Sequence, residues 1–284
     1  MDNLQLILLN IDYSVHHGDW NWKDISSPFT RIYYVKKGHA KIHLPHFTQE
    51  LKPHCLYMIP PFTLHSYECD DYFAHFYIHV YENQKGKLNM LEEFNFPTEI
   101  HARALDFQLV TRLLEINPNR NLKQYDPKLY DNQAMLLKNI AEEKAQADYR
   151  ILETKGILSQ LVSRFFKHAV PKYEVQDERI KMALNFIRKR IDESIKISRL
   201  SEICSLSDDH FIRLFKKEMH CTPIQYINKK KIEKAQLMLT TEDTTIKDIA
   251  YSLSFENISY FNKIFKQITN YTPTQYNQMF KRII

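Results

Sequence analysis

The sequence predicts an α+β protein with more than one domain: a β-rich N-terminal part, a helical middle and an all-helical C-terminal part. Three observations support this fold class. Residues 25 to 97 alternate polar and apolar side chains between turn residues, residues 98 to 172 carry apolar side chains at helical spacing, and the last third repeats one helical unit. With 284 residues, the chain has room for two domains of ordinary size.

Short strands are expected in the N-terminal part, residues 1–97. The alternation is clearest at Arg31 to Val35, Ala40 to Leu44, Leu56 to Ile59 and Phe73 to Val80. Short strands separated by turn residues are typical of a small barrel or jelly roll. We therefore expect a β-barrel or jelly roll here.

The last of these strands has two faces of different chemistry. Residues two apart in a strand point the same way, so His75, Tyr77 and His79 share one face. The residues between them are apolar. A mixed aromatic and polar face suits a sugar or another small polar ligand, although the same side chains could also be satisfied parts of a core.

The middle part, residues 98–172, is predicted to be helical. Its apolar stripes at helical spacing are Leu105, Leu109, Leu113 and Ile116, then Leu136, Leu137 and Ile140, then Ile157, Leu158, Leu161, Val162 and Phe165. Such a stripe either packs on its own domain or forms a dimer seam, and the residues leave both interpretations open.

The C-terminal part, residues 176–284, repeats itself at an offset of 50. Phe215-Lys216, Thr222-Pro223 and Gln225-Tyr226 recur as Phe265-Lys266, Thr272-Pro273 and Gln275-Tyr276. Upstream the offset is 49, which places one extra residue, Glu256, in the second turn. Two copies of one supersecondary unit explain this pattern.

Each copy is expected to contain two short helices joined by a turn. Ser207 and Asn257 are natural N-caps for the second helix of each copy, and that helix turns Phe211 and Phe215, or Phe261 and Phe265, inward. Each Thr-Pro pair then starts another helix. Ile227 to Leu239 fit a long helix that connects the copies.

Charge and composition narrow the function classes. The chain carries +5 overall, yet residues 1–175 hold 20 Lys+Arg against 21 Asp+Glu while residues 176–284 hold 19 against 13. A positive excess confined to the last third is typical of a part that meets phosphate. No apolar run could cross a bilayer, and the four cysteines lack a paired spacing, so we expect a cytoplasmic protein.

The repeat resembles the DNA-binding domain of the AraC/XylS family of bacterial regulators. The family pattern is matched in order by Asp248-Ile249-Ala250, Phe255, Ser259-Tyr260-Phe261, Phe265-Lys266 and Thr272-Pro273-Gln275-Tyr276. This resemblance implies two helix-turn-helix units that bind double-stranded promoter DNA. The chain departs from the pattern where His220, Ser254 and Asn270 replace glycine and Asn277 replaces arginine, so the turns could have another shape.

By resemblance, the outward faces of the two second helices would read DNA. In the first unit Asp209, Ile212 and Arg213 would meet base edges, in the second Ser259, Asn262 and Lys263. Lys216 and Lys266, with the helix starts at Ser207 and Asn257, would hold the phosphate backbone. Taken singly, polar residues such as Ser259 and Asn262 could also be merely solvated.

The segment from Leu51 through Tyr57 to Tyr67 resembles the cupin-type sensory domain of this family. That resemblance implies a pocket for a small-molecule effector, such as a sugar. The residues near the positions that line this pocket are Lys37, Tyr67, His75 and Tyr77. Enzymatic cupins hold a metal with an HxH motif and a downstream carboxylate, and His43, His46 and Glu50 have the wrong spacing. We expect no metal and no cofactor.

We therefore expect a ligand-responsive transcriptional regulator that is not an enzyme and that forms a homodimer. An activator, which would also contact RNA polymerase, is favoured, although the residues themselves do not exclude a repressor. Two alternatives remain: a constitutive regulator whose barrel only dimerises, and a cupin-type enzyme with an accessory basic domain. The residues do not identify the effector or the operator.

Overall fold

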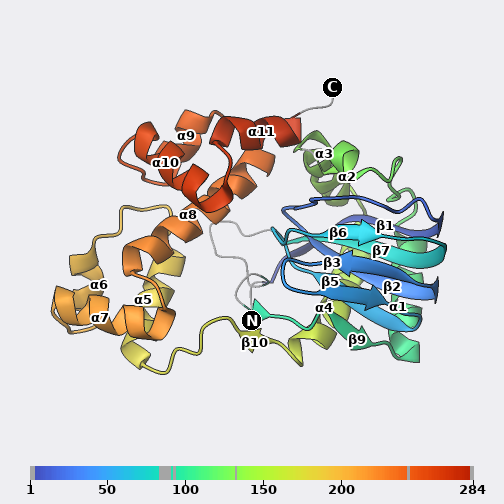
Figure 1. The fold of residues 1–284 in the computed structure, drawn as a ribbon, viewed down its shortest axis with the longest axis horizontal. Helices are drawn as coiled ribbons and strands as arrows, with labels where there is room; N and C mark the ends of the chain where they lie inside the picture. Colours follow the sequence, from blue (N-terminus) through green and yellow to red (C-terminus); the bar gives the residue numbers. More distant parts are fainter. Residues whose placement is uncertain (1–3, 83–90, 92–93, 132, 242–243, 282–284) are drawn as a thin grey trace. The chain divides into compact units, whose positions relative to one another are not determined.

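The computed structural model describes residues 4–82, 91, 94–131, 133–241 and 244–281. These residues form two compact units, which divide between residues 170 and 171 (Figure 1). Within the described ranges, every helix is too short or too polar to span a membrane.

The first unit contains two antiparallel sheets, as the alternation predicted (Figure 1). The larger sheet has the order β1-β7-β2-β5-β9 and the smaller one β4-β3-β6. Their bounds are β1 (Leu6–His17), β2 (Thr30–Gly38), β3 (Ala40–His43), β4 (Thr48–Leu51), β5 (Cys55–Ile59), β6 (Ser66–Glu68), β7 (Tyr72–Glu82) and β9 (Glu99–His101). A short ribbon pairs β8 (Phe94–Asn95) with β10 (Val170–Pro171).

The larger sheet has a different hydrophobic core on each face. Strand β7 shows this directly: Phe76, Ile78 and Val80 belong to a cluster with helical residues, while Tyr77 belongs to a second cluster shared with the smaller sheet. The predicted alternation along this strand is therefore confirmed. The second cluster fills the space between the two sheets, which we call the barrel interior.

Four helices accompany the sheets: α1 (Ala104–Ile116), α2 (Pro127–Tyr130), α3 (Gln133–Lys144) and α4 (Asp148–Phe166). Helices α1 and α4 pack on the outer face of the larger sheet and share one core with it. Their buried residues in this core are Val110, Leu113 and Ile116 of α1, and Ile157, Leu158, Leu161, Val162 and Phe165 of α4. Most of the predicted stripe of α1 is confirmed, because Leu113 and Ile116 are buried and Leu109 packs against the same core. The first residue differs, since Leu105 is 55% exposed and Val110 is buried instead. The capping interaction between Asp106 Oδ2 and the Arg103 backbone N–H buries Asp106 and turns Leu105 to the solvent.

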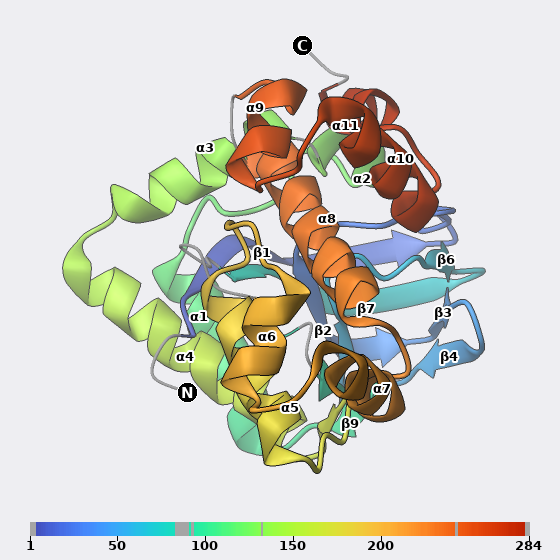
Figure 2. The same cartoon turned by 90° about the vertical axis from the view of Figure 1, so that its left-hand side faces the viewer.

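The second unit is all-helical, and its elements repeat the predicted pattern. They are α5 (Glu178–Lys189), α6 (Ile197–Ile203), α7 (Asp208–Met219), α8 (Pro223–Thr241), α9 (Ile246–Ser252), α10 (Ile258–Thr269) and α11 (Pro273–Lys281). One core joins α5, α6, α7 and the start of α8; a second joins the rest of α8 with α9, α10 and α11. Figure 2 shows α8 running from one bundle to the other.

The repeated Thr-Pro-x-Gln-Tyr segment forms a capping box in both bundles. Thr222 Oγ1 accepts from the Gln225 backbone N–H at 3.3 Å, and Gln225 Oε1 accepts from the Thr222 backbone N–H at 2.9 Å. Thr272 and Gln275 make the same pair of bonds at 3.1 and 2.9 Å. Because the proline occupies the first helical position, its missing N–H costs nothing.

The three residues that replace family glycines keep the backbone conformation that glycine would favour. His220, Ser254 and Asn270 have φ of 55°, 53° and 65°, which is the left-handed region. The turns therefore retain their shape, at the cost of some backbone strain, because any side chain with a Cβ adopts this region less readily than glycine.

Candidate functional site

Helices α7 and α10 each bury an aromatic face and expose the opposite one. Phe211 and Phe215 of α7, like Phe261 and Phe265 of α10, have no exposed surface. Both helices start at a side-chain cap: Ser207 Oγ accepts from the His210 backbone N–H at 3.4 Å, and Asn257 Oδ1 accepts from that of Tyr260 at 2.8 Å. The cap and the buried rings fix which side chains face outward.

The predicted DNA-contacting residues lie on these outward faces. All are exposed except Ile212, which is half-buried against the first core. The exposed ones are Ser207, Asp209, Arg213 and Lys216 around α7, and Asn257, Ser259, Asn262, Lys263 and Lys266 around α10. Ile212 can thus offer only part of its side chain to a partner.

The cations on the two outward faces lack the ion pairs that several other cations of the second unit make. On α5 and α6, Arg179 pairs with Asp177 and Arg199 with Glu202. In the part of the chain that the structure describes, Arg213 of α7 has no carboxylate within ion-pair distance, and neither do Lys216, Lys263 and Lys266. Unpaired cations on one exposed face are available to bind phosphate.

A set of polar contacts, which we call the latch, joins the two bundles. Lys231 of α8 donates to the backbone oxygens of Glu193 (3.0 Å) and Ser254 (3.5 Å). Ser254 Oγ donates to the backbone oxygen of Asp192 at 2.6 Å. Lys234 pairs with the Asp192 carboxylate at 2.5 Å. Burial lowers the pKa of Lys231 to about 8, against the opposing attraction of Asp192. No sequence pattern indicates these contacts, because backbone oxygens are the main acceptors.

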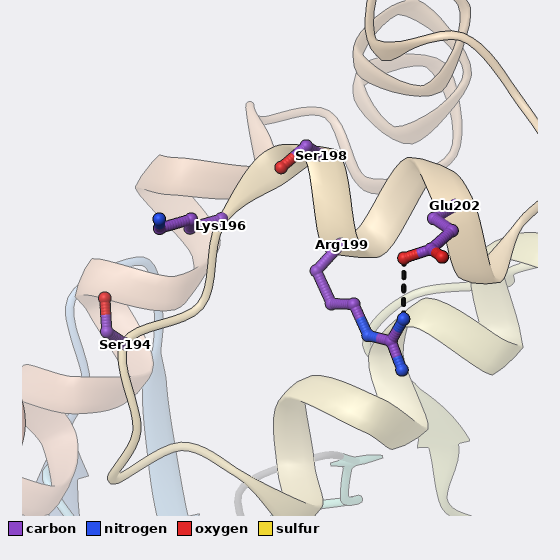
Figure 3. Close-up of a pocket in the computed structure, with 5 residues that line it drawn as sticks. All are labelled: Ser194, Lys196, Ser198, Arg199 and Glu202. Carbon is purple, nitrogen blue, oxygen red and sulfur yellow. Dashed lines mark hydrogen bonds and ion pairs between the residues drawn. The ribbon is translucent and has the colours of Figure 1, made fainter.

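The loop between α5 and α6 borders a shallow pocket of about 590 Å³ (Figure 3). Lys196 and Ser198 lie beside it at the start of α6, and Arg199 donates to Glu202 at 2.6 Å across one helical turn. Because Arg199 is neutralised by Glu202, Lys196 is the side chain here that offers net positive charge.

The barrel interior contains three of the four predicted ligand-binding residues. Tyr67 stacks on Trp20 with ring centroids 4.0 Å apart, and His75 lies 5.1 Å from the same indole. Tyr77 accepts at its hydroxyl oxygen from the Leu122 backbone N–H at 2.7 Å. Burial lowers the pKa of His75, so this imidazole is neutral. Its buried Nδ1 has no hydrogen-bond partner among the described residues.

Lys37 is placed differently from the other three residues. It is exposed near the end of β2, directly after the register shift between Val35 and Lys37. A bulge interrupts the strict alternation of side chains, so the position of Lys37 does not follow from counting along the strand.

A buried ion pair, which sequence reasoning did not find, lies in the barrel interior. Arg31 of β2 is 1% exposed and donates from Nη2 to Asp131 at 2.5 Å and to Ser27 at 2.6 Å. Its Nη1 donates to the Tyr130 hydroxyl at 2.7 Å and to His79 Nε2 at 3.2 Å. Burial raises the pKa of Asp131, and the attraction of Arg31 opposes this. Since 100 residues separate Arg31 from Asp131, no local pattern could reveal the pair.

The described residues contain no group of three His, Cys, Asp or Glu side chains that could hold a metal ion. Cys55, Cys69, Cys204 and Cys221 are free thiols.

Comparisons with known proteins agree with the helical repeat. Residues 200–279 match a family model described as a helix-turn-helix domain. The uncharacterised HTH-type transcriptional regulator YdeC of Bacillus subtilis (strain 168) is 23% identical over 242 residues, 82% of this chain and 83% of YdeC. The probable transcriptional regulator LumQ of Photobacterium leiognathi is 28% identical over 128 residues, 43% of this chain and 52% of LumQ.

Among solved structures, an apo ToxT variant from Vibrio cholerae strain SCE256 is 13% identical, with a TM-score of 0.49 and coverage of 96% of this chain and 98% of that one. The matched helix-turn-helix model covers the capped and repeated helices described above, from α6 to α11. These helices form a helix-turn-helix domain of the AraC type, and the relatives that the chain resembles are HTH-type transcriptional regulators.

Proposed function

We propose that α7 and α10 are the recognition helices of this regulator and that each lies in the major groove of promoter DNA. The observation that carries the proposal is the pair of outward faces with unpaired cations, held in place by capped helices with buried aromatic rings. An α-helix fits the major groove, where each base pair presents its own pattern of donors and acceptors.

The residues divide into base-reading and backbone-binding groups. Arg213 would take guanine in a bidentate pair, and Asn262 would take adenine. Lys216, Lys266 and, at the start of α6, Lys196 would contact phosphates, because the first helix of such a unit crosses the backbone. Asp209, Ser259 and Lys263 complete the base-facing set, and Ile212 would contribute a partial apolar contact with thymine methyl groups.

Titration of the full chain with promoter fragments tests these roles. We expect Arg213→Ala to weaken the cognate site by about 1 to 3 kcal/mol and to relax sequence preference there. Lys216→Ala should weaken all sequences alike. Arg179→Ala, whose side chain is paired with Asp177 on α5, is the matched control and should bind as wild type. Equal losses on cognate and scrambled DNA for Arg213→Ala would refute its base-reading role.

We further propose that the barrel interior binds a small polar effector, such as a sugar. The stacked Trp20 and Tyr67 rings and the unpartnered Nδ1 of His75 support this, since sugars combine apolar faces with hydroxyl groups. Lys37 would then lie at the rim. Such a ligand would act by binding one of two conformations of the protein more tightly, which increases the population of that conformation.

Thermal stabilisation by a panel of sugars tests the effector site. Tyr77→Phe keeps the ring and removes the hydroxyl, and His75→Gln keeps a polar group, so both variants should fold. We expect both to reduce the stabilisation by the active sugar, whereas Lys41→Gln, at an exposed ion pair with Glu68, should not. Unchanged stabilisation in both variants would exclude these two residues.

We also propose that the protein forms a homodimer and activates transcription, in which case it would contact RNA polymerase. Tyr149 and Leu152 of α4 are 65% and 74% exposed, which supports a contact between copies. It equally supports the alternative of a constitutive regulator whose N-terminal unit only dimerises. Leu152→Glu combined with light scattering tests the contact, and a mass equal to wild type would remove α4 from the interface.

A further inference from the structure

A basic pocket lies on the edge of the larger sheet in the first unit. It has a volume of about 610 Å³ and is formed by the segment around β9, the start of α1 and the end of α4. His101, Arg103, Arg164, Lys167 and His168 line it, together with Glu99. All these residues belong to one unit, and Glu99 reaches the barrel interior through its hydrogen bond with Tyr57.

The negative charges near this pocket are already engaged. Glu99 Oε2 accepts from the Tyr57 hydroxyl at 2.9 Å and from Gln49 Nε2 at 2.8 Å. The buried carboxylate of Asp106 accepts from the Arg103 backbone N–H at 2.8 Å and pairs with Arg164 Nε at 3.1 Å. Asp106 therefore holds the Arg164 side chain and the backbone at Arg103, and it leaves the Arg103 guanidinium unpaired.

Two of the cations are unneutralised. Over the ranges that the structure describes, the Arg103 guanidinium and the Lys167 ammonium have no carboxylate within ion-pair distance. Both side chains are exposed, so they are free to move toward a ligand. The cluster has three cationic side chains and two imidazoles that can donate hydrogen bonds.

The position of Arg103 is hard to explain by helix stability. It is the N-cap of α1 and its side chain makes no capping hydrogen bond. A cation at a helix N-terminus opposes the helix dipole, and Ser, Thr, Asp and Asn are the favoured caps. Four helices of the second unit follow that rule with Asp177, Ser207, Thr245 and Asn257, whereas α6 begins at another cation, Lys196, to which we assigned a phosphate contact. A residue that breaks a local rule is often there for a binding role.

We propose that this pocket binds a small molecule carrying a phosphate group. Arginine offers a planar fork of donors and lysine a point charge, a combination that suits the several acceptor oxygens of phosphate. The volume is within the range of small-molecule sites. His168 lies two residues before Val170, the last residue of the first unit, so an occupant would touch the segment that leads to the DNA-binding unit.

Calorimetric titration of the full chain with pyrophosphate tests the proposal, with sodium chloride of equal ionic strength as the blank. Arg103→Gln/Lys167→Gln removes the two unpaired charges from exposed positions, and we expect its affinity to fall by roughly tenfold or more. Lys23→Gln/Lys123→Gln removes two exposed lysines elsewhere in this unit and should bind as wild type. Arg103→Lys/Lys167→Arg should retain binding.

Two outcomes would overturn the proposal. The first is a wild-type heat signal equal to the chloride blank, and the second is equal pyrophosphate affinity in the Gln double variant and the control. If in the second case the double variant also loses affinity for every promoter fragment, these cations contact the DNA backbone instead. Because pyrophosphate binding is measured without DNA, a failure of the proposed base-reading residues would not affect the result.

Discussion

Replacing Lys231 by methionine should remove a pH dependence from the stability of the second unit. Lys231 is 5% exposed, and burial lowers the pKa of its ammonium from 10.5 to about 8. A tenfold change in an acid dissociation constant corresponds to about 1.4 kcal/mol, so keeping this ammonium charged in the folded state costs about 3 kcal/mol. Methionine has a similar length and no charge, and it packs beside Phe255 without that cost.

The sign of the effect follows from proton counting. Below pH 8, Lys231 is protonated in both folded and unfolded states, so the cost is constant. Between pH 8 and 10.5 the folded state loses its proton first, and the free energy of unfolding rises with pH. By pH 9, wild type should gain about 1.4 kcal/mol over Lys231→Met relative to their difference at pH 7.

Urea unfolding of both proteins at about pH 7, 8 and 9 measures this difference. Lys229→Met is the matched control, because Lys229 is exposed on the same helix and should give the same difference from wild type at every pH. A wild-type minus Lys231→Met difference that stays constant over this pH range would refute the inferred burial of the charge. At neutral pH the relieved cost and the lost bonds to Glu193 and Ser254 nearly cancel, so little net change is expected there.

Three further changes have expected outcomes. His220→Gly should raise the free energy of unfolding by about 1 kcal/mol in urea titrations, because glycine adopts φ of 55° without strain; a loss of stability would contradict the left-handed turn. Thr272→Ala should lower it by about 1 kcal/mol through loss of the capping box, and no change would mean that the cap is not formed. Asp131→Asn should lower the melting temperature of the first unit through a loss of about 3 to 5 kcal/mol, since Arg31 would keep a buried charge without its counter-ion; a melting temperature equal to wild type would show that Arg31 is neutralised by another group.

The helical part was predictable because its signals are local. Caps, prolines at first helical positions and apolar side chains at a spacing of three and four lie within a few residues of one another. The extra residue placed at Glu256 also agrees with the structure, where Phe255 and the cap Asn257 are separated by one residue more than Leu206 and Ser207. The shape of the turns without glycine was harder to predict, because the left-handed φ at Ser254 depends on the surrounding contacts.

The N-terminal part was predictable only where alternation is clear. Strand β1 was not recognised, because Leu6 to Ile11 form a continuous buried stretch that lacks a period of two. Helices pack on one face of β1, and polar residues such as Arg120 lie at the other. Strand β1 therefore has no solvent-exposed face, and without one its sequence does not alternate. The contacts of the barrel interior with Tyr130 and Asp131 are also beyond local patterns, since they join a strand to a segment 100 residues away.

The two helix-turn-helix bundles have separate cores, so the structure must fix their relative position by other means. Helix α8 passes through both cores, and the latch adds contacts from Lys231, Asp192 and Ser254 at its middle. Two binding units at a fixed separation act on a two-part site almost as a single body, whereas a swivel between them would lose much of the second contact to entropy. Breaking the latch should therefore weaken binding to an operator with both half-sites far more than binding to either half-site alone, even where the stability of each bundle is unchanged.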